Sequence, residues 1–195
     1  VGPIFAQRIQ RVDVAQAPVD AGVFAGGFGA IEAEYAFCLG ADAPADKLAW
    51  TAAEAASLVG SAHVAIEIAS SPLATINQLG AFVIIADFGN NAGLLVGPAL
   101  REWSPATDAS YTCQTEIEGK VVGRGGAATL PGGPLAALAF ALGRCARNGQ
   151  PVRAGQFVTT GASTGIHDIR PGEQGRVTFD DAGSINVRAV RRRPA

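Results

Sequence analysis

Two glutamates stand one residue apart in a stretch that is otherwise apolar. In residues 31–39 the larger apolar side chains alternate with Glu32, Glu34, Ala36 and Cys38, which is the period-2 pattern of a half-buried β-strand. Such a strand places Glu32 and Glu34 on one face, with their Cα atoms roughly 6–7 Å apart. Like charges at that distance disfavour each other's ionised form unless a cation lies between them. The alternative is a solvated outer face, but the small apolar Ala36 and Cys38 on the same face favour a site.

A third glutamate, Glu67, is a lone acid in a second alternating stretch, residues 64–69. Three carboxylates without neighbouring lysines suggest an all-oxygen pocket, and hard oxygen ligands select Mg²⁺, Mn²⁺ or Ca²⁺. His63 and His167 are possible additional ligands, although their spacing does not require it. Glu116 and Glu118 repeat the pattern, but they flank a predicted turn and are expected to be exposed hairpin charges.

Composition limits the classes of protein that this chain can represent. The 195 residues are 48% hydrophobic and 16% charged, which suits one domain with a substantial core. A net charge of −2 argues against a nucleic-acid partner. Three scattered cysteines fit neither a disulfide framework nor a zinc motif and favour a cytoplasmic location, and no apolar run is long enough to span a membrane. The chain begins with valine and contains no methionine, so we expect that N-terminal residues are missing.

Other segments predict a mainly β, α+β architecture with a few packed helices. A helix is predicted over residues 51–59, because Thr51 and Glu54 form a capping-box pattern and Gly60 can close it. A second helix is predicted over residues 134–148, with Pro134 at its first position. Strands are predicted over residues 156–160, 176–179 and 185–190, a hairpin over 113–122, and a turn over 18–22.

Several of these stretches, in this order, resemble a known family. The resemblance covers IEAEYAF (residues 31–37), AIEI (65–68), ADFGNNAG (86–93), LPGGPLAAL (130–138) and the segment 142–161. Together they are similar to the fumarylacetoacetate hydrolase superfamily, in its branch of 2-keto-4-pentenoate hydratases and 4-oxalocrotonate decarboxylases. This implies a mixed β-sandwich or roll like the C-terminal domain of that superfamily. Residues 1–195 would form a single catalytic domain, without the family's N-terminal helical portion.

The resemblance also implies roles for individual residues. Glu32, Glu34 and Glu67 would hold one Mg²⁺ or Mn²⁺ ion, which chelates the 2-oxo and carboxylate oxygens of the substrate and stabilises an enolate. The remaining implied roles are a general acid/base for Asp20, a catalytic role for Asn90, and substrate binding by Asn91, Ser163 and Thr164. The chain departs from the family where a lysine would precede Val1 and where Ser71-Pro72 replaces a serine–arginine pair.

The function implied is hydration of a 2-hydroxy-2,4-dienoate to a 4-hydroxy-2-oxo acid in aromatic catabolism, by a cytoplasmic homo-oligomer. The alternatives are a 4-oxalocrotonate decarboxylase, an acylpyruvate C–C hydrolase, or a non-catalytic partner subunit. The missing arginine after Ser71 disfavours the decarboxylase, whose substrate carries a second carboxylate.

Overall fold

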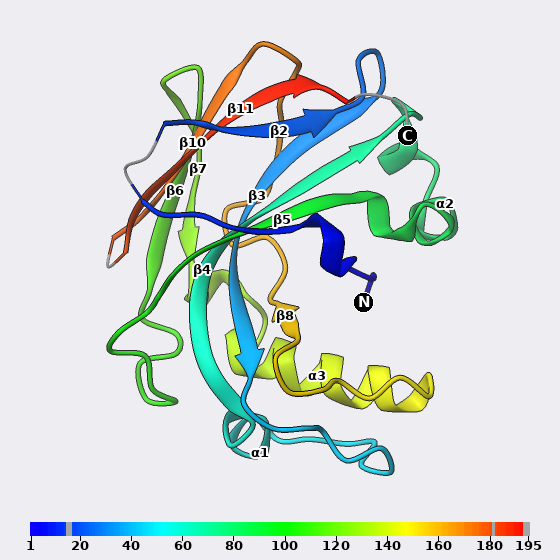
Figure 1. Cartoon of the computed structure of the whole chain (residues 1–195), viewed down its shortest axis with the longest axis vertical. Helices are drawn as coiled ribbons and strands as arrows, with labels where there is room; N and C mark the ends of the chain where they lie inside the picture. Colours follow the sequence, from blue (N-terminus) through cyan, green and yellow to red (C-terminus); the bar gives the residue numbers. More distant parts are fainter. Residues whose placement is uncertain (15–16, 181, 193–195) are drawn as a thin grey trace.

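The computed structural model describes residues 1–14, 17–180 and 182–192. Its centre is a pair of long antiparallel strands, β3 (Phe28–Leu39) and β4 (Val59–Ser71), which curve through the molecule from one end to the other (Figure 1). The predicted strands at residues 31–39 and 64–69 are therefore confirmed, and both extend further. The sequence suggested that β3 is half-buried, but Glu34 is only 1% exposed and Ala36 is fully buried, so covering elements lie on both of its faces.

In the described part of the chain the strands form two mixed sheets. The six-stranded sheet has the order β1-β5-β4-β3-β8, with β9 also pairing with β3, and the five-stranded sheet has the order β2-β11-β10-β6-β7. The parallel pairs are β1 with β5 and β2 with β11. The remaining strands are β1 (Ile9–Arg11), β2 (Val19–Val23), β5 (Asn91–Ala99), β6 (Thr112–Ile117), β7 (Lys120–Gly126), β8 (Phe157–Thr159), β9 (Ile166–Asp168), β10 (Gln174–Phe179) and β11 (Gly183–Arg191).

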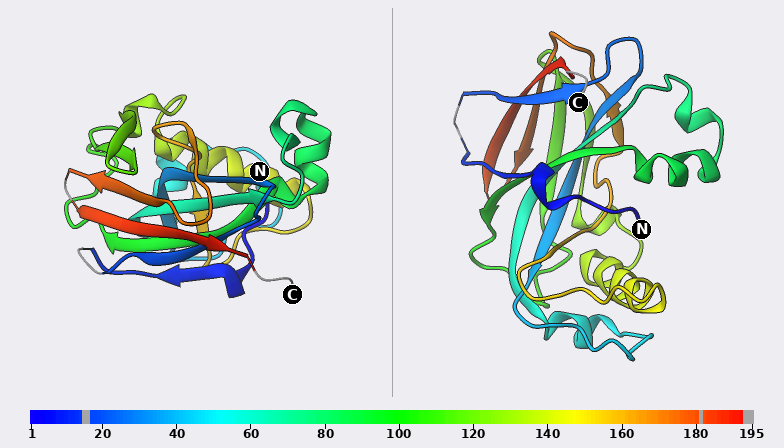
Figure 2. Two further views of the ribbon diagram at one scale, coloured as in Figure 1. Left: turned by 90° about the horizontal axis from the view of Figure 1, so that it is seen from above. Right: turned by 45° about the vertical axis from the view of Figure 1, so that its right-hand side comes forward.

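The main core lies between the two sheets. Phe37 and Ile66 of the six-stranded sheet meet Val177, Phe179 and Val187 of the five-stranded sheet in one hydrophobic cluster. The side chains of β3 and β4 that alternate with these core residues point away from the five-stranded sheet. We call this side the outer face of the six-stranded sheet. In Figures 1 and 2, α2 and the N-terminal segment lie on the side of the six-stranded sheet away from the five-stranded sheet.

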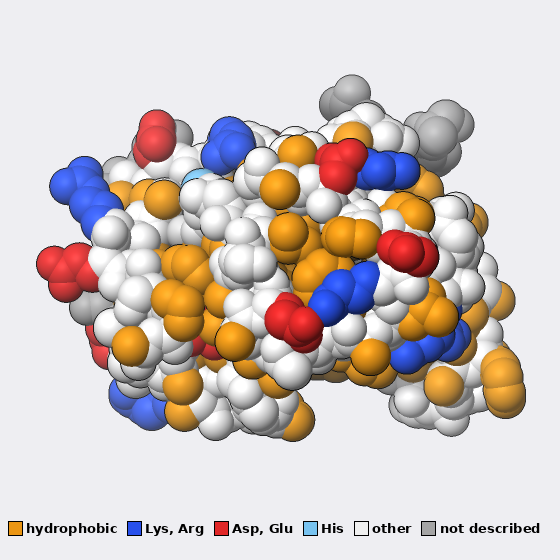
Figure 3. All heavy atoms as spheres, turned by 90° about the horizontal axis from the view of Figure 1, so that it is seen from below, with side chains coloured by type: hydrophobic (Ala, Val, Ile, Leu, Met, Phe, Trp, Pro, Cys, Tyr) orange, Lys and Arg blue, Asp and Glu red, His pale blue; other side chains and the backbone are white. Residues whose placement is uncertain are grey.

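Three α-helices and four short 3-10 helices complete the described fold: α1 (Ala52–Ala56), α2 (Ala81–Ala86), α3 (Pro134–Arg147), η1 (Ala6–Arg8), η2 (Ile76–Gln78), η3 (Phe88–Asn90) and η4 (Ala127–Thr129). The helix α3 begins with Pro134 as predicted and buries Leu138 and Leu142 in the main core. The end that carries α1 and α3 shows apolar side chains between neighbouring acidic and basic ones (Figure 3).

The helix α1 has the predicted capping box, because the Thr51 side chain accepts from the Glu54 N–H and the Glu54 side chain accepts from the Thr51 N–H. It ends earlier than predicted. Gly60 does not close this helix: it lies in β4, where its backbone passes so close to Gly40 that a Cβ atom would lie 2.9 Å from the Gly40 Cα.

The hairpin between β6 and β7 is confirmed, and Glu118 and Gly119 both have positive φ at its turn, as a type I′ turn requires. The turn predicted over residues 18–22 is wrong, since this segment is the strand β2. No helix in the described ranges is long and apolar enough to cross a membrane.

Candidate metal centre

The register of β3 and β4 brings the three glutamates together. Glu32 lies directly opposite Glu67 in this antiparallel pair, and Glu34 is one pleat further along β3. Directly opposite residues share a face, with Cβ atoms about 4.5–5.5 Å apart. All three side chains therefore project from the outer face of the six-stranded sheet, and the alternation in the sequence predicted the shared face of Glu32 and Glu34.

Burial and mutual repulsion dominate the electrostatics of this cluster. Desolvation and then the charge of Glu67 raise the pKa of Glu32 to about 7. Desolvation and the charges of Glu67 and Glu32 hold the pKa of Glu34 well above its usual range, and desolvation also raises the pKa of Glu67. No positively charged side chain contributes to any of the three shifts, so the described residues leave this negative charge uncompensated.

Hydrogen bonds from neighbouring segments fix two of the carboxyl groups. The N–H of Gly161 donates to Oε2 of Glu34 over 2.9 Å, and Nδ2 of Asn91 donates to Oε1 of Glu67 over 2.8 Å. A side-chain hydrogen bond with Glu34 also lowers the pKa of Glu67, which places these two carboxyl groups within reach of each other. The Asn91 Oδ1 is buried and has no hydrogen-bond partner in the described structure.

The donor atoms of this cluster are of the kind that binds a hard divalent cation. The donors are carboxylate and amide oxygens, which Mg²⁺, Mn²⁺ and Ca²⁺ prefer. A cation would remove the repulsion that raises the three pKa values, and the unpartnered Asn91 Oδ1 is a further oxygen beside Glu67. No group of three or more His, Cys, Asp or Glu side chains in the described ranges is already gathered into a metal shell.

The other two predicted substrate-binding residues, Ser163 and Thr164, have different surroundings. The Ser163 N–H donates to the carbonyl of Ala33 over 2.7 Å, so the loop after Gly161 runs along β3, and the Ser163 Oγ is buried without a partner in the described structure. Thr164 instead bonds Thr115 of the five-stranded sheet through their hydroxyl groups over 2.8 Å. Thr164 thus ties the two sheets together.

Asn90 and the two histidines also take part in structural hydrogen bonds. Nδ2 of Asn90 donates to Oδ1 of Asn77 over 3.2 Å, which holds η3 beside Asn91. His63 lies on the outer face, but its Nδ1 contacts the Gly97 carbonyl at 3.0 Å and its Nε2 contacts the Ser61 hydroxyl at 2.9 Å, so both nitrogens have partners. His167 lies opposite Ile31, and its side chain therefore points toward the main core and the five-stranded sheet.

The structure does not bring Asp20 to this site. Asp20 lies on β2, and an oxygen of its exposed carboxylate is 2.6 Å from a guanidinium nitrogen of Arg188. Its neighbours Ala21 and Val23 point into the main core, so Asp20 projects from the far side of the five-stranded sheet. Two sheets, which pack about 10 Å apart, separate it from the glutamates. An acid/base role for Asp20 at the glutamate cluster is therefore wrong on geometric grounds.

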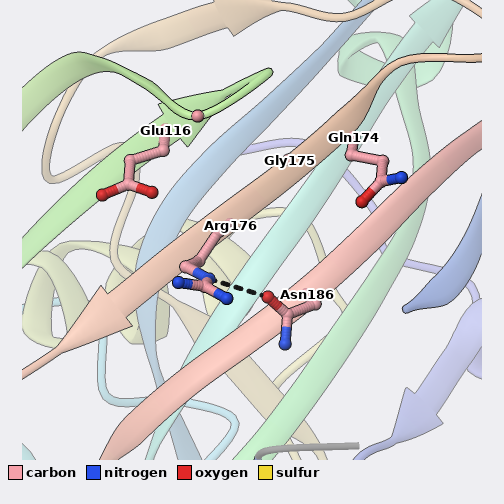
Figure 4. A pocket seen from close by; sticks show the side chains of 6 residues that line it. Glu116, Gln174, Gly175, Arg176 and Asn186 are labelled. Carbon is pink, nitrogen blue, oxygen red and sulfur yellow. Dashed lines mark hydrogen bonds between the residues drawn. The ribbon is translucent and has the colours of Figure 1, made fainter. Parts of the chain in front are cut away.

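Glu116 also lies on this far side. It is half-buried rather than fully exposed, and it lines a shallow hollow of about 240 Å³ with Gln174, Arg176 and Asn186 (Figure 4). Arg176 donates through Nε to Oδ1 of Asn186 over 2.9 Å. Glu116 is therefore a matched control for the glutamate cluster, from a different sheet and a polar environment.

Sequence reasoning missed two supports of the site, Thr159 and the Gly161 N–H, both of which hydrogen-bond Glu34. They reach it because β8 pairs with β3 at residues 36–38. Such a pairing between distant segments has no local pattern in the sequence.

Comparisons with known proteins agree with this fold. The chain is 31% identical over 159 residues to a 2-keto-4-pentenoate hydratase from Burkholderia vietnamiensis, covering 80% of this chain and 59% of that protein. It superimposes with a TM-score of 0.72 and 22% identity on 4-oxalocrotonate decarboxylase from Pseudomonas putida G7, solved with calcium and acetate, covering 92% of this chain and 66% of that one. With fumarylpyruvate hydrolase from Pseudomonas aeruginosa, solved with Mn²⁺ and pyruvate, the TM-score is 0.67 at 16% identity, covering 96% and 77%.

These similarities define the class: a mainly β domain with the fold of the fumarylacetoacetate hydrolase superfamily. The resemblance suggested by the sequence motifs, to the hydratases and decarboxylases of that superfamily, is confirmed. The chain spans 40% to 59% of the length of the curated relatives that it matches. No family model matches the chain.

Proposed function

We propose that residues 1–195 form a single catalytic domain that uses one Mg²⁺ or Mn²⁺ ion to act on a 2-oxo acid. The reaction proposed is the addition of water to a 2-hydroxy-2,4-dienoate, giving a 4-hydroxy-2-oxo acid in the breakdown of aromatic compounds. The observation that carries this proposal is the cluster of Glu32, Glu34 and Glu67, whose raised pKa values have no positive side chain to offset them.

In this proposal Glu32, Glu34 and Glu67 hold the cation. When bound, the cation supplies a Lewis acid for the 2-oxo oxygen, which favours proton movements at the neighbouring carbons. Asn91 keeps the Glu67 carboxylate in position through its Nδ2, and its unpartnered Oδ1 is available to orient substrate or water. Asn90 has a positioning role, since its bond to Asn77 holds η3.

The loop of residues 160–163 supplies the substrate-side contacts. The N–H of Gly161 is already bonded to Glu34, whereas the Ser163 hydroxyl is buried beside β3 without a partner. A buried hydroxyl without a partner carries a desolvation cost that a hydrogen bond to a ligand would remove. We therefore keep Ser163, rather than Thr164, as the candidate for binding the substrate.

The second candidate is decarboxylation of a 2-oxo dicarboxylate, which the similarity to 4-oxalocrotonate decarboxylases supports. It uses the same cation site but requires a group that receives the second carboxylate. Two further alternatives share the fold. A C–C hydrolase would use the site on acylpyruvates, and a non-catalytic partner subunit would not act on a substrate.

The test combines metal binding with turnover. Binding of Mn²⁺ to the purified chain is measured by titration calorimetry, and turnover of 2-hydroxypenta-2,4-dienoate is followed by loss of its ultraviolet absorbance. We expect Mn²⁺-dependent turnover, and we expect Glu67→Ala to remove both metal binding and turnover with an unchanged circular dichroism spectrum. Glu116→Ala, on the far sheet, should change neither.

Two results would contradict the proposal in different ways. Full Mn²⁺ affinity in Glu67→Ala would show that the glutamate cluster is not the metal site. Metal binding without turnover of any 2-oxo acid would indicate the partner-subunit role.

A further inference from the structure

Apolar clusters lie on the outer face at both ends of the glutamate site. Toward α2, Ala30 and Ala69 of the sheet are covered by side chains of that helix, and toward the other end Ala36, Ala65 and Leu94 are covered by the N-terminal segment and β8. The covering side chains are Val83, Ile84, Ile4, Ile9 and Phe157. The second end also carries polar groups, because His63 lies directly opposite Ala36 and the guanidinium of Arg11 lies 5.2 Å from the centre of the Phe157 ring.

One apolar side chain beside the carboxylates is left uncovered. Ile166 of β9 is the direct partner of Glu32 in the antiparallel pairing with β3. It therefore projects from the same face as Glu32, with a Cβ–Cβ separation of about 4.5–5.5 Å. Ile166 is 53% exposed, whereas its neighbour His167 turns to the opposite side of the sheet.

In the described structure, no lysine or arginine side chain forms an ion pair or hydrogen bond with Glu32, Glu34 or Glu67. The cation tied to the site by a hydrogen bond is Arg8, whose Nη1 donates to the backbone carbonyl of Asn91 over 3.3 Å. Its guanidinium lies 5.8 Å from the centre of the Phe5 ring, so Arg8 is engaged with backbone and an aromatic ring.

We propose that Ile166 determines substrate specificity, and that the site takes 2-oxo monocarboxylates with an apolar tail in preference to 2-oxo dicarboxylates. This inference rests on the proposed cation site and assigns the residue that selects the tail of its substrate. The tail packs on Ile166, and each methylene buried there strengthens binding by about fourfold. A second carboxylate at this position loses water without gaining a cationic partner, which weakens binding.

The test compares two ligands of equal length that differ at the far end. Titration calorimetry of the Mn²⁺-loaded chain is done with 2-oxopentanoate, which ends in a methyl group, and with 2-oxoglutarate, which ends in a carboxylate. We expect the wild-type chain to bind 2-oxopentanoate at least roughly tenfold more tightly. Ile166→Lys should reverse the order, and Ile166→Val should leave it unchanged. These measurements need no turnover.

Matched variants separate the possible failures. A wild-type preference for 2-oxoglutarate that disappears in Arg8→Gln would overturn the inference and assign the second carboxylate to Arg8. Equal Mn²⁺-dependent binding of both ligands would overturn the inference but leave the cation site intact. Loss of all Mn²⁺-dependent binding in the wild-type chain would overturn both. If thermal melting shows that Ile166→Lys is unfolded, Ile166→Ser replaces it, and an unchanged affinity ratio in that variant refutes the role of Ile166.

Discussion

Replacing a glutamate of the cluster should stabilise the metal-free protein at pH 8. Glu32 suits this test, because burial and the charge of Glu67 raise its pKa from 4.5 to about 7. An acid whose pKa is higher in the folded state binds protons more tightly there, so folding stability falls as pH rises from about 4.5 to 7. At about 1.4 kcal/mol per pH unit, ionised Glu32 lowers the free energy of unfolding by about 3 kcal/mol at pH 8. Glu32→Gln keeps the shape of the side chain and removes this cost.

Urea unfolding followed by circular dichroism measures the difference. In EDTA at pH 8, Glu32→Gln should be up to about 3 kcal/mol more stable than the wild-type chain, and at pH 4.5 the two should agree within about 1 kcal/mol. Mn²⁺ at about 100 times its dissociation constant should then stabilise the wild-type chain by about 2.7 kcal/mol and the variant by much less. The added metal should therefore remove most of the advantage of the variant.

Glu116→Gln is the matched control, because Glu116 projects from the far sheet beside polar groups. It should leave the response to Mn²⁺ unchanged. The reasoning is refuted if Glu32→Gln is less stable than the wild-type chain at pH 8 without metal. It is also refuted if Mn²⁺ stabilises both chains equally.

Four further changes have expected outcomes. Mn²⁺ binding should release protons below about pH 7 and tighten as pH rises, because the carboxyl groups must ionise; calorimetry in buffers of different ionisation enthalpy measures this. Asp20→Asn should leave Mn²⁺ affinity unchanged and cost at most about 1 kcal/mol in urea unfolding, since its ion pair with Arg188 is exposed. Thr51→Ala should cost about 1 kcal/mol by removing the capping box of α1, again without an effect on Mn²⁺. Gly125→Ala should destabilise by about 1–3 kcal/mol and also weaken Mn²⁺ binding, because its Cβ would overlap the Ser163 carbonyl in the loop that supports Glu34.

The parts of the fold that could be predicted are those with a strong local pattern. The alternation in residues 31–39 and 64–69 predicted β3 and β4, and Pro134 with the apolar run that follows it predicted α3. The capping residues Thr51 and Glu54 predicted the start of α1, because the hydrogen bonds that they make are local.

The parts that could not be predicted depend on distant partners. The three-residue strand β1 pairs with β5, and the five-residue strand β2 pairs with β11 at the other end of the chain. Residues 18–22 have the composition of a turn, but parallel pairing with β11 makes them extended. The sequence also did not predict that residues 81–86 form the helix α2, since a short apolar run suits a buried strand as well as a helix.

The contrast between Glu67 and Asp20 shows that the face of the sheet from which a side chain projects decides whether it can belong to a site. Both residues were matched to a family motif by their order along the chain. Glu67 lies on a strand whose register with β3 is set by long alternating stretches, so its match predicts its face as well as its position. Asp20 lies on a short strand of the other sheet, where a shift of one residue would exchange it with Ala21 in the core. A motif match therefore places a side chain in a site only where the register of its strand is known, and this condition selects the three glutamates while it excludes Asp20.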